Sequence, residues 1–334
     1  MILASRLLRA SRICSLRIMQ RLPYNDYGHA MRQRFGGRVQ KLAVDSGLSC
    51  PNRDGRVGYG GCTFCLNDAF SPSYCREGGS LLEQLDRAMA FHSLRGRKGE
   101  HYLAYLQAGT NTYSDVEKLR SIYSELLSHS NISGLIVGTR PDCVNSEILD
   151  MLADLSHDKY IAVEYGIESA YDATLRRVNR GHDFEAAVRA VAMTKERGLD
   201  VGGHFILGLP GESVEDIVRG VARINILGLN FIKFHQLQIY RGTAMEREYA
   251  ASPEDFIFAN GFRLENYIAL VCDVLRHLDP SIAVERLLSQ APVRLLSSSP
   301  LGGIRPDEFR GRVVERLNSL GAVQGDMANV LFGA

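Results

Sequence analysis

The stretch Val39–Cys65, VQKLAVDSGLSCPNRDGRVGYGGCTFC, joins a strand-like run to a cysteine-rich loop. Its first part, Val39–Val44, has the composition and length of a β-strand. Cys50, Cys62 and Cys65 follow this run directly, with the spacing C-x11-C-x2-C. In folds built on parallel sheets, the reactive groups lie at the carboxyl ends of the strands. The stretch therefore predicts a metal-binding or reactive centre after the first strand.

Further strand-like runs alternate with helix-like segments along the chain. They are rich in Val, Ile, Leu, Tyr and Phe, and they are His101–Leu106, Gly134–Gly138, Tyr160–Tyr165, Val201–Leu207 and Phe231–Leu237. Alternation of this kind predicts βα units and a parallel sheet. Six units are two fewer than a closed barrel contains. We expect an α/β fold, either an incomplete (β/α)6 TIM-like barrel that is open at its side or a doubly wound sheet.

Cap signatures predict where several helices begin. The candidate starts are Ser80-Leu-Leu-Glu83, Ser114-Asp-Val-Glu117, Ser213-Val-Glu-Asp216 and Ser252-Pro253-Glu254-Asp255. After about residue 245, helix-like segments at Phe262–Leu278 and Asp307–Leu320 flank a strand-like run at Ala283–Leu288. We expect residues 35–245 to form the barrel and residues 246–334 to form a C-terminal α/β extension packed on it.

Composition restricts the class of protein. The chain has 334 residues, of which 45% are hydrophobic and 23% charged, a mixture typical of globular proteins. No apolar stretch approaches the roughly 18 residues of a membrane span, so no membrane partner is expected. The net charge of +1 excludes a strongly basic nucleic-acid scaffold.

The first 21 residues differ from the rest of the chain, with five Arg, three Ser and no acidic residue. This composition resembles an organelle transit peptide. The alternatives are a disordered extension and a start codon placed upstream of a true start at Met19. In each case we expect residues 1–21 to lie outside the fold. Cytoplasm is the expected location, and an organelle is the alternative if the segment is a transit peptide.

The cysteines are seven in number, and three of them lie within sixteen residues. This clustering predicts a metal site in a reducing compartment rather than a disulfide scaffold. A C-x2-C pair serves both zinc sites and iron–sulfur clusters. A closed zinc site would need a fourth ligand such as Cys75 or His101. Without one, three cysteines leave a coordination position open, and the residues alone do not separate the two alternatives.

The spacing, with the aromatic Phe64 before the last cysteine, resembles the cluster loop of the radical S-adenosylmethionine (SAM) superfamily. The common spacing there is C-x3-C-x2-C. The longer first gap is similar to the YhcC/YtqA-type branch, which is related to the radical SAM domain of the Elongator catalytic subunit. Further matches over roughly residues 35–290 are Gln107–Tyr113, Thr139–Asp142, Glu164–Ser169, Arg177–His182, Gly208–Glu212 and Tyr240–Thr243.

The resemblance implies a [4Fe–4S] cluster held by Cys50, Cys62 and Cys65, with SAM on its fourth iron. It also implies that one electron, from a donor such as flavodoxin or ferredoxin, cleaves SAM to a 5′-deoxyadenosyl radical. No catalytic residue beyond the cluster ligands is predicted. By the same resemblance, Gln107 and Thr110 lie where relatives contact the methionine amino group. A plain strand-to-helix turn is the alternative there.

The remaining candidate SAM contacts come from later strands. Arg180 matches an arginine that pairs with the SAM carboxylate, and a solvated loop arginine is the alternative. His204 lies where relatives often carry Asp near the adenosyl group, although a lone strand histidine is more often a core residue. Glu164, Glu168 and Ser169 are candidate acceptors for the ribose hydroxyls, with an ion pair to a neighbouring Arg as the alternative. Phe64 packs either near the adenine or in the core.

The resemblance implies a radical SAM enzyme that acts on a large substrate, with tRNA and modification of its wobble uridine as the first expectation. Polar and apolar residues alternate over Lys233–Tyr240, which indicates either the lining of the barrel mouth or a half-exposed edge strand. The alternatives to a tRNA enzyme are a radical SAM enzyme for a small molecule such as a porphyrin precursor, and a non-catalytic zinc or iron–sulfur protein.

Overall fold

Val39–Val44 forms strand β1, at one edge of a seven-stranded sheet. The structure is a computed structural model that describes residues 22–66, 72–259, 261–298 and 301–329. The predicted extension at residues 1–21 lies outside this described part. Every strand of the sheet runs parallel to its neighbours, in the order β1-β2-β3-β4-β5-β6-β8. The other six strands are β2 (His101–Leu106), β3 (Ile132–Thr139), β4 (Tyr160–Glu168), β5 (Asp200–Leu207), β6 (Phe231–Gln236) and β8 (Ala283–Arg286).

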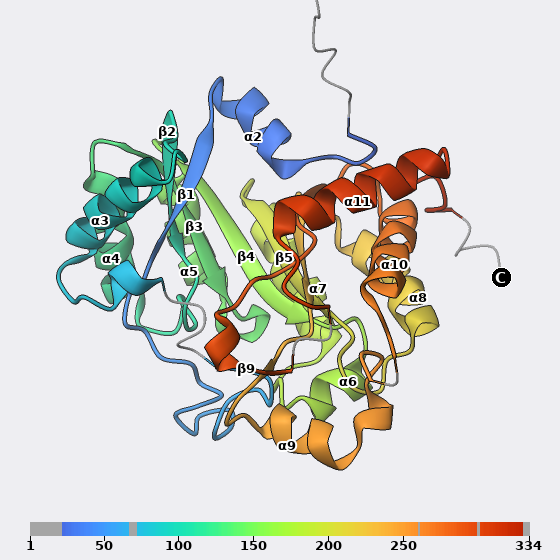
Figure 1. The fold of residues 1–334 in the computed structure, drawn as a ribbon. Coiled ribbons are helices and arrows are strands. Elements are labelled where there is room, and N and C mark those ends of the chain that lie inside the picture. The colour runs from blue at the N-terminus through green and yellow to red at the C-terminus, as the bar shows by residue number, and fades with distance from the viewer. Residues whose placement is uncertain (1–21, 67–71, 260, 299–300, 330–334) are drawn as a thin grey trace, which may run out of the picture.

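Helices cover the outer side of this curled sheet (Figure 1). They include α3 (Leu81–Leu94), α4 (Val116–Ser128), α5 (Ser146–Leu155), α7 (Phe184–Lys195), α8 (Val214–Leu227) and α10 (Leu264–His277), and α11 (Pro306–Ser319) packs on α10. Each buries one apolar stripe, and local signals set its ends. In α8, the Ser213 hydroxyl accepts from the Asp216 amide at 3.1 Å, and the helix ends at Gly228 with φ 62°.

The two edge strands of the sheet approach each other, which gives the open barrel its shape. Helix α2 (Tyr27–Phe35) contacts both β1 and β8, and its N-cap residue Asp26 makes a bridge to Val284. Inside the barrel, the Lys41 ammonium of β1 binds Glu285 of β8 at 2.5 Å. The prediction of an incomplete α/β barrel with a C-terminal α/β extension is therefore confirmed, and the extension adds β8 to the barrel sheet itself.

Smaller elements surround the carboxyl ends of the strands. Helices α6 (Asp172–Arg177) and α9 (Ala244–Ala251) lie there, below the sheet in Figure 1. A two-stranded antiparallel ladder joins β7 (Ile239–Tyr240) to β9 (Leu296–Ser298). The remaining short elements are one-turn 3₁₀ helices at Ser73–Cys75, Pro141–Cys143, Pro253–Asp255 and Val293–Leu295. None of the helices in the described part is both long and apolar enough to cross a membrane.

Several predicted boundaries need correction. The fourth strand continues to Glu168, so Glu164 lies inside β4 and not at its end. The N-cap of α4 is Asp115, whose carboxylate accepts from Lys118 N at 2.8 Å, because Asp is as good a cap as the predicted Ser114. The segment from Ser252 forms only the 3₁₀ turn Pro253–Asp255, because the preceding α9 already ends at Ala251.

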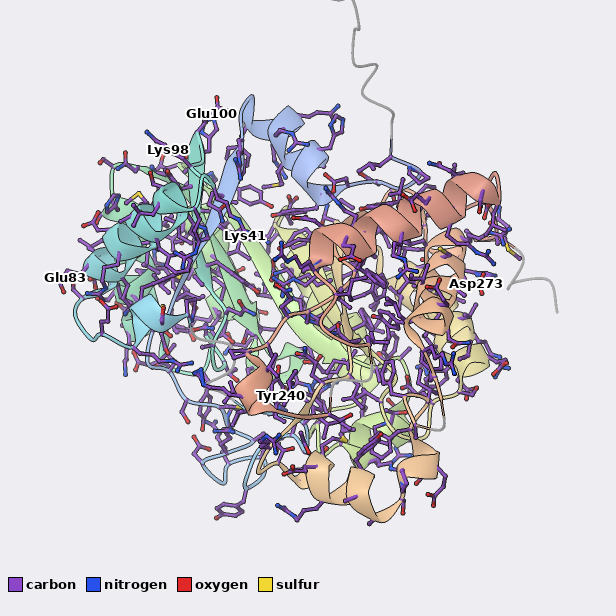
Figure 2. All side chains as sticks on the ribbon, viewed as in Figure 1. Lys41, Glu83, Lys98, Glu100, Tyr240 and Asp273 are labelled. Carbon is purple, nitrogen blue, oxygen red and sulfur yellow. The ribbon has the colours of Figure 1, made fainter. Side chains whose placement is uncertain are left out.

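A basic run with Arg95, Arg97 and Lys98 precedes β2 and lies away from the carboxyl ends of the strands (Figure 2). Figure 2 shows Lys98 and Glu100 at the top of the molecule, near the amino end of β2, and Tyr240 toward the opposite end. Arg95, Arg97 and Lys98 are exposed. The run is thus a solvent-facing turn, as charged runs usually are.

Candidate functional site

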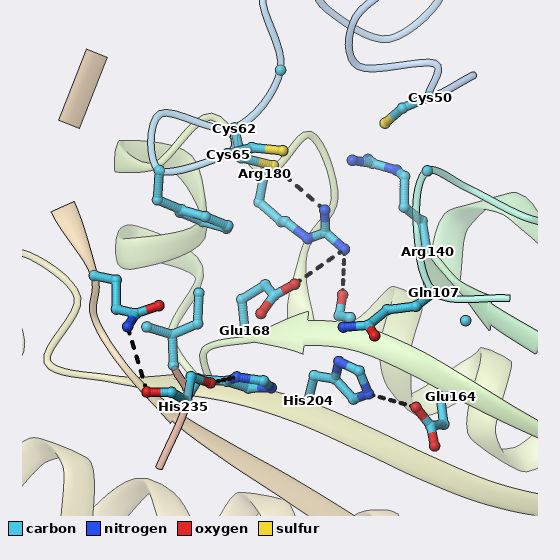
Figure 3. A pocket seen from close by; sticks show the side chains of 18 of the residues that line it. Cys50, Cys62, Cys65, Gln107, Arg140, Glu164, Glu168, Arg180, His204 and His235 are labelled. Atoms are coloured by element: carbon cyan, nitrogen blue, oxygen red, sulfur yellow. Dashed lines mark hydrogen bonds and ion pairs between the residues drawn. The ribbon is translucent and has the colours of Figure 1, made fainter. Parts of the chain in front are cut away.

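A cavity of about 370 Å³ lies at the carboxyl ends of the strands, under the loop that carries the three cysteines. Figure 3 shows the cysteines on one side of it and the polar residues of β4, β5 and β6 on the other. The structure brings nearly all the predicted site residues to this cavity. Its lining includes Cys50, Cys62, Phe64, Cys65, Gln107, Thr110, Glu164, Glu168, Arg180 and His204.

Ser169 is the one predicted site residue that does not line the cavity. Its hydroxyl donates to the Glu212 carboxylate and accepts from Tyr171 N at 3.0 Å. The Tyr171 contact lies within the turn that leads from β4 to α6, and Glu212 belongs to the segment between β5 and α8. The hydroxyl is therefore engaged in local structure and is not presented to a ligand.

The cysteine loop is fastened to the segment that carries Arg180. The Asn52 side-chain amide donates to the Asn179 carbonyl at 2.6 Å and to Cys62 Sγ at 3.6 Å. The Thr63 amide donates to the Val178 carbonyl at 3.0 Å. Cys62 is buried. Burial, together with the neighbouring Cys62, raises the pKa of the Cys65 thiol to about 11.

Arg180 connects the cysteines to the end of β4. Its Nη1 donates to Cys62 Sγ at 3.4 Å, and its Nη2 donates to the Gly166 carbonyl. Glu168 lies 3.7 Å from the same guanidinium and has a left-handed backbone, with φ 74°. A Cβ at residue 166 would lie 2.8 Å from Arg180 Nη2, so glycine at this position makes room for the arginine. Arg180 thus contacts the Cys62 thiol and also lines the cavity.

Several buried polar atoms around the cavity have no hydrogen-bond partner among the residues that the structure describes. They are Arg180 Nε, Arg140 Nη1 and Thr110 Oγ1. The other two nitrogens of the Arg140 guanidinium bind Asp142 at 2.9 and 2.8 Å. Because buried polar groups are nearly always hydrogen-bonded, unpaired donors lining a cavity point to a polar ligand.

At the base of the cavity, four charged side chains form a closed ring of ion pairs, and one of them, Glu164, lines the cavity. Glu164 accepts from Lys41 at 2.7 Å and from Lys233 at 2.6 Å, and Glu285 binds the same two ammonium groups at 2.5 and 3.2 Å. The ring joins β1, β4, β6 and β8. Lys233 also donates to the Tyr105 hydroxyl at 2.9 Å. Two positive and two negative charges balance within the ring.

The ring shifts the pKa values of its members. Burial alone would raise the pKa of Glu164, but Lys233 and Lys41 hold it well below its ordinary value. Burial lowers the pKa of Lys233 to about 8, against the opposing effect of Glu164 and Glu285. The pKa of Lys41 is raised, because the two carboxylates outweigh its burial. The positive charges of Lys41 and Arg286 also lower the pKa of Lys233.

Two histidines form the floor between the ring and the cavity. His204 Nε2 lies 2.8 Å from Glu164, and its ring is 5.5 Å from that of His235. Burial, followed by Arg286 and His204, lowers the pKa of His235 well below its ordinary value, so this imidazole is neutral. His235 lines the cavity, Lys233 pairs with Glu164 and Glu285 inside the barrel, and β6 has neighbours on both sides. The alternation over Lys233–Tyr240 therefore reflects a barrel lining.

Sequence reasoning did not identify Lys41, Arg140, Glu285 or Arg286 as site residues. Arg140 belongs to the stretch Thr139–Asp142, one of the sequence matches to the family, so a local signal for it existed. Lys41 and Glu285 meet only because the sheet curls, and no local pattern connects them. The two candidate fourth zinc ligands do not line the cavity: the Cys75 thiol donates to the Ala43 carbonyl at 3.5 Å, and His101 begins β2 at its amino end. Within the described residues, no three His, Cys, Asp or Glu side chains are arranged around a single metal position.

Comparison with known proteins agrees with this geometry. Residues 52–223 match the radical SAM superfamily, and residues 229–318 match the radical SAM C-terminal domain. The chain is 39% identical to protein YhcC of Escherichia coli K12 over 268 residues, covering 80% of this chain and 84% of that protein. It is 32% identical to YtqA of Bacillus subtilis over 307 residues, covering 90% and 92%.

More distant relatives are longer proteins. Mouse Elongator complex protein 3 is 27% identical over 209 residues, which cover 60% of this chain and 35% of that protein. The structure of Elp3 from Methanocaldococcus infernus, with residues 1–46 deleted, has a TM-score of 0.61 at 18% identity. The match covers 86% of this chain and 64% of that one, and it shows a shared fold. On its family match and its close relatives, the chain belongs to the radical SAM superfamily and is an enzyme of that superfamily.

Proposed function

We propose that the cavity holds a [4Fe–4S] cluster on Cys50, Cys62 and Cys65, with SAM beside it, and that the enzyme modifies the wobble uridine of tRNA. The observation that carries the proposal is the placement of three thiols and three unpaired buried donors around one cavity. Three thiolates leave one iron of a cluster open, as a bound cofactor requires. When bound, the cluster supplies the electron that splits SAM into methionine and a 5′-deoxyadenosyl radical.

The chain's own groups would orient SAM. Arg180 is the cation beside Cys62, and its planar guanidinium suits the SAM carboxylate. Thr110 and Gln107, at the end of β2, would accept from the amino group. Phe64 would cover the adenine and exclude water. Arg140 Nη1 would supply a further donor on the same side of the cavity.

Of the three residues that the sequence predicts as acceptors for the ribose hydroxyls, two are already engaged by other side chains. The oxygens of Glu164 are occupied by Lys41, Lys233 and His204. The Ser169 hydroxyl is bound to Glu212. Glu168 retains exposure to the cavity, so we assign the ribose hydroxyls to Glu168 and place His204 at the adenosyl side.

The tRNA substrate is supported by relatives. Elongator complex protein 3 of the mouse matches 60% of this chain. A protein named tRNA uridine(34) acetyltransferase from Methanocaldococcus infernus is 33% identical over 81 residues, covering 24% of this chain and 15% of that protein. A cavity at the open end of the barrel would admit a nucleotide extruded from its stack, which enzymes acting on bases require. Flavodoxin or ferredoxin would supply the electron.

Anaerobic reconstitution with iron and sulfide tests the proposal. We expect about four irons per chain, and reduction with dithionite in the presence of SAM should release 5′-deoxyadenosine. A Cys62→Ser variant should lose both results, whereas Cys272→Ser, which changes a thiol buried under α11, should keep them. Unfractionated tRNA should then be altered at uridine 34, as read by nucleoside mass spectrometry.

Three outcomes separate the alternatives. One zinc per chain without SAM cleavage would overturn the enzymatic proposal. Cleavage of SAM with no change in any tRNA would retain the radical chemistry and reject the tRNA substrate. Modification of a small molecule in place of tRNA would favour a porphyrin-type substrate class.

A further inference from the structure

A bulge in β8 turns two charged residues toward the barrel interior. Val284 pairs with Ile232, but the next pair along the ladder is Arg286 with Lys233, so Glu285 is an extra residue opposite Lys233. Two residues of a bulged strand then oppose one residue of its neighbour. Glu285 completes the ring with Lys41 and Lys233, and Arg286 lines the cavity.

Arg286 carries a charge that nothing around it balances. Among the described residues it has no hydrogen-bond acceptor and no ion-pair partner. The four charges of the ring cancel one another, and His235 beside it is neutral. The neighbours of Arg286 include Lys233 and His235, whose pKa values it helps to lower. This end of the cavity therefore has one unpaired positive charge on a half-buried guanidinium.

We propose that Arg286 binds an oxyanion of the substrate, at the floor of the cavity beside His235. This inference rests on the proposed function, because it concerns the substrate of the same cavity. A guanidinium binds phosphate or carboxylate through two parallel hydrogen bonds. The oxyanion is the phosphate of a nucleotide if the substrate is RNA, and a carboxylate if the substrate is a small molecule.

The cofactor is not the partner of Arg286. The amino and carboxylate groups of SAM belong at the cysteines, where Arg180 lies against Cys62. Arg286 instead pairs in register with Lys233, deep in the barrel and level with His204, the register partner of Lys233 on β5. The two arginines thus serve different groups: Arg180 serves the cofactor and Arg286 serves the substrate.

Ligand binding to the reconstituted protein with SAM present, and without reductant, tests this assignment. The probes are uridine 5′-monophosphate, uridine and glutarate, measured by isothermal titration at 10 mM or below. For Arg286→Gln we expect uridine 5′-monophosphate to bind about 10- to 100-fold more weakly than to the unaltered protein, because a charge-assisted hydrogen bond is lost. Arg286→Lys should recover part of that loss.

The matched control is Arg294→Gln, which removes the same charge from an exposed position outside the cavity lining. It should leave all three affinities unchanged. Iron content and unfolding midpoint should be the same in each variant, which excludes misfolding. If only glutarate depends on Arg286, the oxyanion assignment holds and the tRNA proposal fails. If no probe depends on Arg286, or if Arg286→Gln weakens SAM binding, the assignment is refuted.

Discussion

Replacing Glu164 by Gln tests whether the buried ring holds the barrel together. Glu164 has no exposed surface and accepts from Lys233 at 2.6 Å, Lys41 at 2.7 Å and His204 at 2.8 Å. The substitution keeps the size of the side chain but removes its charge, and it turns an amide N–H toward at least one of these donors. Glu285 alone must then balance two ammonium groups.

The magnitude follows from the burial of the ring. Removing one partner of a buried ion pair typically costs about 3–5 kcal/mol. Lys233 limits the cost, because its pKa is about 8 and it can lose its proton when Glu164 is gone. Because Glu164 raises the pKa of Lys233, its removal lowers that pKa further and makes loss of the proton easier, which places the expected cost toward the lower end of this range. We therefore expect Glu164→Gln to lower the unfolding free energy by about 3–4 kcal/mol.

Urea unfolding of the metal-free protein at pH 7, followed by circular dichroism, measures the effect. The matched control is Glu248→Gln, which removes a carboxylate from the half-exposed pair with Arg177 and should cost less than about 1 kcal/mol. Adding Lys233→Met to Glu164→Gln should recover part of the loss, because it removes the uncompensated cation. A loss for Glu164→Gln as small as that for Glu248→Gln would refute the reasoning.

Three further measurements test other parts of the structure. Below pH 4.5, the unfolding free energy should fall more steeply for the unaltered protein than for Glu164→Gln. The pKa of the Glu164 carboxyl is lower in the folded than in the unfolded protein, so this group stabilises the fold above its unfolded pKa and loses that effect as the pH falls. Parallel slopes for the two proteins would contradict this. Gly109→Ala should lower the unfolding free energy by about 1–2 kcal/mol and reduce iron uptake. Residue 109 has φ 77°, and a Cβ there would lie 2.5 Å from the Leu48 carbonyl oxygen. An unchanged urea midpoint would contradict this prediction. Gly311→Ala, in α11 with nothing near its Cβ, should raise the midpoint by the equivalent of about 0.5–1 kcal/mol, and a lowered midpoint would show hidden crowding there.

The parts of the fold that the sequence predicted are those set by local patterns. The strands at Val39–Val44 and His101–Leu106 have their predicted bounds, because polar or charged residues flank each of these short runs. Tyr160–Glu168 extends three residues beyond its prediction. The strand continues past Gly166, although glycine is a typical strand end, because β5 still pairs with β4 at residues 166 and 168. Tertiary pairing therefore overrides the local signal at this point.

The residues of the candidate site likewise divide into those that a local motif predicts and those that only the tertiary structure brings together. The cysteine loop and Arg180 could be predicted because each lies in a short sequence motif that can be recognised without knowing the tertiary structure. Lys41 and Glu285 could not, since 244 residues separate them and only the curl of the sheet brings β1 to β8. Buried charges of this kind are costly unless paired, so a fold that retains four of them must pair all four.

The same curl explains why the positive charge on Arg286 becomes available. A flat sheet would leave β1 and β8 as separate edges, and Glu285 would then have only Lys233 to bind. Because the edges meet, Lys41 engages both carboxylates of the ring, and the ring is neutral without Arg286. The ion pair between the two edge strands and the unpaired guanidinium in the cavity are therefore two results of the same curl of the sheet. Lys41→Met should accordingly free Glu285 to pair with Arg286 and weaken binding of uridine 5′-monophosphate, although residue 41 lies outside the cavity lining.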